Sequence, residues 1–259
     1  MIHRNYKEGQ KLDVAGLNQI TVLLDRSETA LTEIGINEWK LDGPPHKHND
    51  KDQIFYILSG NGVIKLGSEE HAVKPGYLIY VPAGLVHQSI TKSSVPLCYV
   101  LYNIFNDSQK EGHSTFAEHI EKVKMIRKQQ AETGNAEVDN LGSAGNIRSP
   151  KVITGIYSGE ESQYESSRQY IHLAMSETGR YEFTAVHWPA GNKGVVIADH
   201  QEEQTIFVLD GEGLISIKNE TVRVKTGDLV YVPINTSYTI ESLETDLKYF
   251  CLKCSVREV

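Results

Sequence analysis

The fold is decided by two copies of one stretch, QIFYILSGNGVIKLGSEEHAVKPGYLIYVPAGLVHQS at residues 53–89 and QTIFVLDGEGLISIKNETVRVKTGDLVYVPINTSYTI at residues 204–240. Aligned without a gap, the copies are identical at 13 of 37 positions, whereas unrelated sequences of average composition match at roughly one position in twenty. The match extends upstream across a small gap, where Trp39 falls opposite Trp188. The chain of 259 residues is therefore a duplication of one structural unit.

Each copy is typical of short antiparallel strands. The runs QIFYIL and TIFVL are rich in β-branched and aromatic residues, SGNG and DGEG are turn signals, and VIKL and LISI resume a strand, which predicts a hairpin. The segments KPGYLIYVPAG and KTGDLVYVPIN each predict a turn, a buried strand and a second turn. Many short strands at even spacing predict an all-β fold, either a sandwich or a barrel, and a closed barrel has no exposed edge strand.

The segment between the copies has a different character. An amphipathic helix is predicted over residues 115–132, with one face formed by Phe116, Ile120, Val123 and Ile126. We interpret its Lys and Arg residues as the solvated face, because glutamates are interspersed among them. A stretch rich in Gly, Asn and Ser then predicts a linker that runs to about Pro150. The expected domains are an N-terminal barrel at 1–112, a connector helix and linker at 113–150, and a C-terminal barrel at 151–259.

Composition excludes several classes of protein. Hydrophobic residues make up 39% and charged residues 23%, as in ordinary globular proteins. The net charge of −8 opposes binding to nucleic acid or anionic lipid. We find no apolar run near the ~20 residues of a membrane span, and MIHRNYKEGQ at the N-terminus lacks the apolar region of a secretory signal. Three cysteines, with Cys251 and Cys254 expected as buried thiols in a terminal strand, indicate a reducing compartment. A cytoplasmic protein is expected.

Four residues of the first copy have the pattern of a metal site. His46 and His48 are two apart, so in an extended segment both imidazoles point to the same face. Gln53 begins the next strand, and His87 follows the glycine-rich turn after it. Three neutral imidazoles with one oxygen donor make an open site for a first-row transition metal. The alternative is that His46 and His48 are exposed loop residues.

The spacing of these residues resembles the cupin family, and the duplication resembles a bicupin, which has two barrels in one chain. The first cupin motif keeps its spacing at His46, His48, position 53 and Gly60, although Gly43 is two residues closer than in the family pattern. The second motif is matched by Gly76, Pro82, Gly84 and His87. The resemblance implies two double-stranded β-helix (jelly-roll) barrels joined by the helix and linker. It also implies a site for Zn, Ni, Fe or Mn whose ligands are His46, His48, Gln53 and His87.

The departure from the family is Gln53, where cupins more often have Glu. A neutral amide oxygen leaves the full charge of the metal to act on a substrate, which favours Lewis-acid chemistry over the stabilisation of an oxidised metal. We therefore expect isomerisation or ring opening of an oxygen-rich substrate. Some cupins that act on uronate-type sugars resemble this chain in having Gln at this position, and that resemblance implies a sugar or uronate-like substrate. Two alternatives remain: a dioxygenase that acts on a diketone or enediol, and a non-catalytic carbohydrate-binding protein. Glu38, Tyr56 and Tyr102 lie on predicted strands and are the candidate catalytic acid or base residues.

The second copy has lost most of the ligand set. Tyr238 replaces His87, and His200 with Gln204 provides too few ligands for tight binding. We expect no metal in the C-terminal barrel, with a small-molecule pocket lined by His187, His200, Gln204 and Tyr238 as the alternative. A small-molecule substrate and a homodimer are the expected partners, because many cupins dimerise through edge strands.

Overall fold

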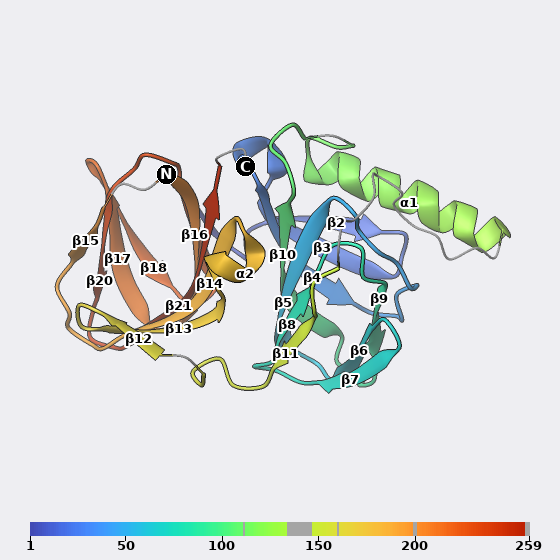
Figure 1. Cartoon of the computed structure of the whole chain (residues 1–259), viewed down its shortest axis with the longest axis horizontal. Helices are drawn as coiled ribbons and strands as arrows, with labels where there is room; N and C mark the ends of the chain where they lie inside the picture. The colour runs from blue at the N-terminus through green and yellow to red at the C-terminus, as the bar shows by residue number, and fades with distance from the viewer. Residues whose placement is uncertain (111, 134–146, 160, 199–200, 257–259) are drawn as a thin grey trace. The chain divides into compact units, whose positions relative to one another are not determined.

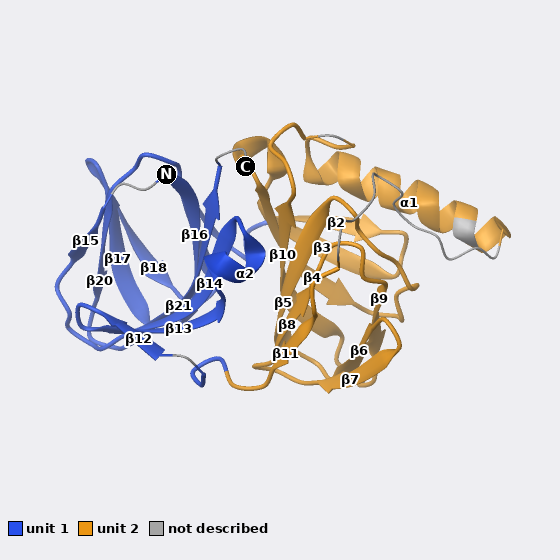
Figure 2. Cartoon of the chain, viewed as in Figure 1, with its two compact units in different colours: residues 1–9, 156–259 blue, residues 10–155 orange. Residues whose placement is uncertain are grey.

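The computed structural model describes residues 1–110, 112–133, 147–159, 161–198 and 201–256 (Figure 1). They form two compact units, one of residues 10–155 and one of residues 1–9 with 156–259 (Figure 2). Each unit contains two antiparallel sheets, so the all-β prediction is confirmed. No helix in the described ranges is long and apolar enough to cross a membrane. The predicted linker falls mostly on residues 134–146, which lie outside the described part of the chain.

The N-terminal unit has a seven-stranded and a three-stranded sheet. In spatial order, the larger sheet consists of β11 (Lys151–Ile153), β8 (Leu78–Val81), β5 (Lys51–Ser59), β10 (Leu97–Phe105), β4 (Thr32–Trp39), β3 (Asn18–Leu24) and β2 (Gln10–Val14). The smaller sheet consists of β7 (Glu69–Val73), β6 (Gly62–Leu66) and β9 (His87–Thr91). A short 3-10 helix, η1 (Arg26–Glu28), joins β3 to β4. Alternate side chains of both sheets form one apolar core, which includes Phe55, Ile57, Ile64, Leu66, Ile79 and Leu97.

The predicted hairpin across SGNG is wrong. Strand β5 pairs with β8 and β10, whereas β6 pairs with β7 and β9, so the turn carries the chain from one sheet to the other. Gly60 has a φ of +76°, and a Cβ there would lie 2.3 Å from the Pro96 carbonyl oxygen. A Cβ at Gly62 would lie 2.4 Å from the Ile90 carbonyl oxygen. Both glycines are therefore needed because the chain passes this close to neighbouring backbone.

The predicted helix is confirmed as α1 (Phe116–Thr133), and it belongs to the N-terminal unit. Phe116 and Ile120 are buried against β2 and β3, with Val123 packed beside them. Figure 1 shows the helix running alongside these two strands. The helix therefore covers the barrel of the N-terminal unit, and its inner face can reach the interior.

The C-terminal unit repeats this plan. Its larger sheet consists of β1 (Ile2–Asn5), β19 (Asp228–Val232), β16 (Glu202–Asp210), β21 (Leu247–Ser255), β14 (Tyr181–Trp188), β13 (Ser167–Leu173) and β12 (Glu161–Tyr164). Its smaller sheet consists of β15 (Val195–Ile197), β20 (Tyr238–Ser242), β17 (Glu212–Ile217) and β18 (Glu220–Lys225). A single-turn helix, α2 (Met175–Thr178), joins β13 to β14. Cys251 and Cys254 on β21 are buried free thiols.

The units differ in their boundaries from the domains expected at 1–112, 113–150 and 151–259. The first strand of the chain, β1, pairs with β19, so residues 1–9 belong to the C-terminal unit. Strand β11 follows the linker in sequence but pairs with β8 of the N-terminal unit. In both units an edge strand comes from a distant part of the sequence and covers the edge of the larger sheet.

Candidate metal centre

The three predicted histidine ligands meet inside the N-terminal unit. His46 and His48 precede β5, and His87 is the first residue of β9. The backbones of His46 and His87 form an antiparallel bridge, with N···O distances of 2.9 and 2.7 Å. The Gly84 N–H, at a φ of +83°, donates to the His48 carbonyl oxygen at 2.7 Å. These contacts fix three backbone positions that are up to 41 residues apart in the sequence.

The imidazole rings of the three histidines face a common point. Their ring centroids are 4.2 Å apart for His46 and His87, 5.1 Å for His46 and His48, and 5.5 Å for His48 and His87. One ring nitrogen from each lies within 4.8 Å of the other two. Nδ1 of His46 and of His87 donates to a backbone carbonyl oxygen at 3.0 and 3.1 Å, which leaves the lone pair on Nε2. His87 Nε2 is buried and has no hydrogen-bond partner among the described residues.

Gln53 supplies an oxygen at the same cavity. Its Nε2 donates to Asn103 Oδ1 at 2.8 Å, whereas its Oε1 is buried without a hydrogen-bond partner in the described structure. A buried amide oxygen without a partner costs about 1–3 kcal/mol unless something else satisfies it. The four side chains predicted as metal ligands therefore line one cavity, and two of them direct unsatisfied lone-pair atoms into the interior.

The electrostatics of the cavity suit metal ligation. Burial, followed by the neighbouring His48, lowers the pKa of His46 to about 3. Burial, followed by His46, also lowers the pKa of His87 well below its usual value. Both imidazoles are thus neutral at physiological pH, as a metal ligand must be. Three imidazole nitrogens and one neutral oxygen fit a divalent first-row transition metal.

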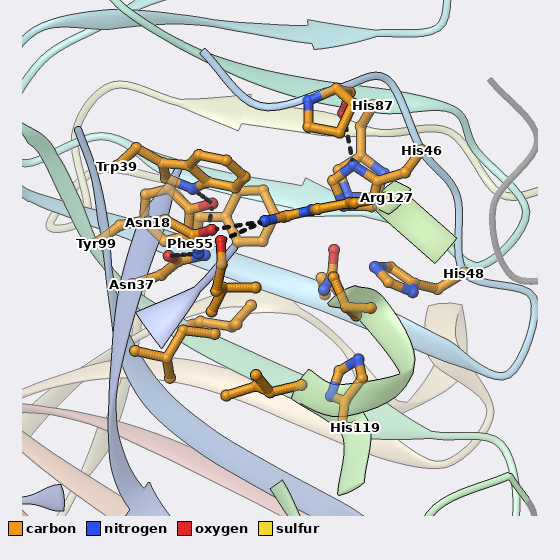
Figure 3. A pocket seen from close by; sticks show the side chains of 17 residues that line it. Asn18, Asn37, Trp39, His46, His48, Phe55, His87, Tyr99, His119 and Arg127 are labelled. Carbon is orange, nitrogen blue, oxygen red and sulfur yellow. Dashed lines mark hydrogen bonds between the residues drawn. The ribbon is translucent and has the colours of Figure 1, made fainter. Parts of the chain in front are cut away.

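The opposite wall of the cavity carries an unneutralised cation (Figure 3). Arg127 of α1 donates from NH1 to the Val14 carbonyl oxygen at 2.9 Å and to Asn18 Oδ1 at 3.1 Å. Its guanidinium carbon lies 5.4 Å from the centre of the Trp39 ring. No carboxylate among the described residues forms an ion pair with it, and burial lowers its pKa only to about 10. The prediction that all basic residues of this helix are solvated is therefore wrong for Arg127.

The Tyr99 hydroxyl connects several residues of this wall by hydrogen bonds. Its hydroxyl accepts from Trp39 Nε1 at 2.7 Å and from Asn37 Nδ2 at 3.3 Å, and Ser89 Oγ lies 3.1 Å away. Burial raises the pKa of Tyr99 to about 12, although hydrogen bonds from Ser89 and Trp39 act in the opposite direction. Tyr99 therefore stays protonated and serves as a rigid polar anchor. The free space inside the cavity is about 60 Å³, enough for about four water molecules or a fragment of similar size.

The structure does not bring the expected catalytic residues Glu38, Tyr56 and Tyr102 to this cavity. Successive side chains of a strand point to opposite faces, and the neighbours of these three residues line the interior. Those neighbours are Asn37 and Trp39 on β4, Phe55 on β5, and Tyr99 and Leu101 on β10. The expectation is therefore corrected: each of the three residues is one position away from an inward-facing residue, so Glu38, Tyr56 and Tyr102 lie on the other face of the sheet.

A second group of buried side chains lies beside the cavity and was missed in the sequence. His119 Nδ1 lies 2.9 Å from Glu33 Oε1, and His113 Nε2 lies 3.6 Å from Glu33 Oε2. All three residues are buried, and His119 also lines the cavity. The sequence carried a signal, because His119 follows Phe116 by three positions and so lies on the apolar face of the helix. It was overlooked because the helix was expected to lie outside the barrels.

In the C-terminal unit, the positions equivalent to the proposed metal ligands carry other residues with other contacts. Tyr238, which replaces His87, donates from its hydroxyl to Gln204 Oε1 at 3.0 Å, so this amide oxygen is satisfied. A cavity of about 210 Å³ is lined by Trp188, Tyr238, Tyr249 and Lys253, among others. His187 Nε2 instead lies 2.8 Å from Asp246 on a partly exposed site. The predicted contribution of His200 falls outside the described residues.

Two known proteins are similar in sequence to parts of this chain. A Methanocaldococcus jannaschii protein, "Uncharacterized protein MJ1618", is 34% identical over 85 residues, which cover 32% of this chain and 68% of that protein. A Streptomyces coelicolor protein, SCO3923, is 36% identical over 42 residues, which cover 16% of this chain but only 40% of that protein.

Solved structures resemble nearly the whole chain at low identity. Ylba from E. coli has a TM-score of 0.70 at 15% identity, covering 99% of this chain and 91% of its own. The oxalate decarboxylase of Lactobacillus farciminis, solved as a formate complex, has a TM-score of 0.68 at 11% identity, covering 99% and 87%. The oxalate decarboxylase of Bacillus subtilis, studied for its Mn(II) centres, has a TM-score of 0.65 at 15% identity, covering 100% and 78%. These likenesses concern the fold.

The family model described as a cupin domain matches twice, at residues 38–103 and 185–252, which together make up more than half of the chain. The chain therefore belongs to the cupin family, and its two barrels make it a bicupin.

Proposed function

We propose that the N-terminal barrel is a divalent-metal-dependent enzyme that acts on a small substrate carrying a carboxylate. The observation that carries the proposal is the pairing, in one cavity, of three converging histidines and an unsatisfied amide oxygen with the unneutralised Arg127. The ligand residues would be His46, His48, Gln53 and His87. The Mn(II) centres of the B. subtilis decarboxylase and the formate bound to the L. farciminis enzyme support metal chemistry on small carboxylates in this fold.

A metal bound by these residues would act as a Lewis acid that polarises a carbonyl or hydroxyl oxygen of the substrate. Arg127 would hold the carboxylate, since a half-buried guanidinium forms strong charge-assisted hydrogen bonds in a fixed geometry. Phe55, Trp39 and Leu101 would exclude water from the reacting end. The small free space suits the carboxylate and the carbon next to it, with the rest of a sugar acid lying outside.

Proton transfer falls to His119 in this proposal. Among the described lining residues, it is the imidazole that remains outside the three proposed ligands. Lys51 Nζ, which can only donate, lies 3.4 Å from its Nε2. Nδ1 therefore carries a proton, which is directed at Glu33 Oε1. A carboxylate-oriented imidazole of this kind would act as a general base only once the contact between Lys51 Nζ and Nε2 opens, and it would then support isomerisation by proton movement between adjacent carbons.

Metal analysis tests the proposal directly. Untagged protein loaded with Mn²⁺, Zn²⁺, Ni²⁺ or Fe²⁺ and then desalted should retain one equivalent of metal in the N-terminal barrel. His48→Ala and His87→Ala should lose it, whereas His71→Ala, on the partly exposed β7, should not. Turnover of hydroxy acids or uronates should proceed under nitrogen, and oxygen uptake would instead support a dioxygenase. Failure of every metal to remain bound would refute the proposed function.

A further inference from the structure

Each barrel has a row of three polar residues on neighbouring strands, and the two rows differ at the middle position. In the N-terminal unit, Asn103 on β10 lies opposite Gln53 on β5 and opposite Glu33 on β4. The corresponding row of the C-terminal unit is Gln204, Lys253 and Glu182. In the N-terminal row Glu33 and Asn103 are 0% exposed and Gln53 is 5% exposed. The orientation of these side chains is therefore set by protein contacts and not by solvent.

The N-terminal row fixes which end of the Gln53 amide faces the cavity. The two ends of an amide have nearly the same shape, but only the oxygen can ligate a metal. Asn103 Nδ2 donates to Glu33 Oε1 at 2.7 Å, which turns Asn103 Oδ1 towards Gln53. Gln53 Nε2 then donates to this oxygen at 2.8 Å, and Oε1 is left for the cavity. Because an ionised carboxylate can only accept, Glu33 determines the direction of both bonds.

Two histidines keep Glu33 ionised. Burial alone would raise its pKa, but the electrostatic interaction with His119, the hydrogen bond from His119 Nδ1 and the neighbouring imidazole of His113 hold the pKa below its usual value. His119 Nδ1 reaches Glu33 from helix α1 at 2.9 Å. The carboxylate that orients the amide thus depends on a residue of the docked helix.

This group is not arranged as a second metal site. One ligand atom each of Glu33, His113 and His119 lies within 4.8 Å of the other two, but the rings of His113 and His119 are stacked, with centroids 4.3 Å apart and planes at 16°. His119 Nδ1 is occupied by its proton, because Lys51 Nζ faces the other ring nitrogen. A buried lysine beside the group also opposes a bound cation.

The C-terminal row provides a natural comparison. Lys253 has three donors and no acceptor, so it cannot accept from the NH2 group of Gln204. Lys253 Nζ instead donates to Glu182 Oε1 at 3.4 Å. The oxygen of Gln204 is taken up by the Tyr238 hydroxyl and is not free for a ligand. The replacement of Asn by Lys therefore accompanies the loss of the orienting hydrogen bonds.

We propose that Glu33 is a positioning residue for the metal site, acting through Asn103 to present the oxygen of Gln53 to the three histidines. A carboxylate ligand would need no such orientation, because both of its ends are oxygens. The amide of Gln53 has one oxygen, and the row of Glu33 and Asn103 turns that oxygen towards the metal site. This inference rests on the proposed metal site, and it adds a determinant of metal affinity that lies outside the four ligands. His119, by contacting Glu33, links the docking of α1 to that affinity.

A double-mutant cycle tests this role with Mn²⁺ as the probe. Glu33→Gln and Asn103→Lys are each made in the parent protein and in a Gln53→Glu background, whose two carboxylate oxygens are equivalent. Mn²⁺ affinity is measured from the EPR signal of the free ion. We expect each change to weaken Mn²⁺ binding about tenfold in the parent but less than about twofold with Glu at position 53, in line with the size of effects on residues behind metal ligands.

The outcomes separate this inference from the proposed function. Equal losses in both backgrounds would mean that Glu33 acts through stability or charge, and would overturn the positioning role while leaving the metal site intact. No binding of Mn²⁺, Zn²⁺, Ni²⁺ or Fe²⁺ by the parent would overturn both. Melting temperatures of the metal-free variants report on folding. If Glu33→Gln does not fold, Asn103→Lys carries the cycle, because the C-terminal barrel already holds a Lys–Glu pair at this register.

Discussion

Replacing His113 should reduce the sensitivity of the N-terminal unit to acid. Burial lowers the pKa of His113 to about 4, against the opposing effect of Glu33, whose Oε2 lies 3.6 Å from His113 Nε2. The unfolded chain, with a pKa of about 6.5, therefore binds a proton first as the pH falls. Stability is present above pH 6.5 and is lost as the pH drops towards 4. From these two values the loss between pH 7.5 and pH 5 is about 2 kcal/mol.

The assay is urea unfolding of metal-free His113→Gln and its parent at both pH values. The chain has two tryptophans, Trp39 in the N-terminal unit and Trp188 in the C-terminal unit. A Trp188→Phe background therefore leaves Trp39 as the fluorescent reporter of the unit in question. We expect the parent to lose about 2 kcal/mol more than the variant between pH 7.5 and pH 5, with unchanged m-values. The comparison reports His113 together with its coupling to Glu33 and His119. The same pH dependence in both proteins would refute the reasoning that His113 is buried in its neutral form.

Three further outcomes are expected. Arg127→Met should weaken oxalate binding to the Mn²⁺-loaded protein by about 1.5–3 kcal/mol, as measured by calorimetry, because a charge-assisted hydrogen bond is lost. Lys124→Met on the same helix is the control, and an equal effect of this variant would exclude a specific contact between Arg127 and the carboxylate. Phe116→Ala should cost about 3–5 kcal/mol of unfolding free energy, because this ring is fully buried under α1; a loss below 1 kcal/mol in urea unfolding would contradict the docking of the helix. Gly62→Ala should destabilise by about 1–3 kcal/mol, because its Cβ would lie 2.4 Å from the Ile90 carbonyl oxygen; thermal melting unchanged from the parent would show that the strand can move away.

The structure confirms the predictions that rest on local pattern. The duplication, the strand-rich barrels and the helix over residues 115–132 depend on the order of apolar residues and glycines, which is written directly in the chain. The convergence of His46, His48 and His87 was also accessible from the sequence. Two of these residues are fixed by a spacing of two along an extended segment, and the third by the turn before β9.

Two predictions depended on which face of a strand a side chain lies on or on which sheet a strand joins, and the structure differs from both. The sequence prediction put three residues on the inner face of their strands, namely Glu38, Tyr56 and Tyr102. Side chains alternate between the two faces with a period of two, so an error of one residue inverts the face. The turn at Gly60 was interpreted as a hairpin, because a sheet switch and a hairpin share the same glycine-rich sequence.

By itself, the sequence determined that the chain is a duplicated β-barrel protein with a clustered histidine motif, because those properties follow from local spacing and internal repetition. Only the tertiary structure decided that α1 closes the first barrel, that Arg127 and His119 enter its cavity, and that Glu33 orients Gln53 through Asn103. These contacts join residues 50 to 113 positions apart, and they exist because packing of the helix and pairing of the strands bring distant side chains together. The order of residues along the chain does not by itself specify which of these distant side chains come into contact.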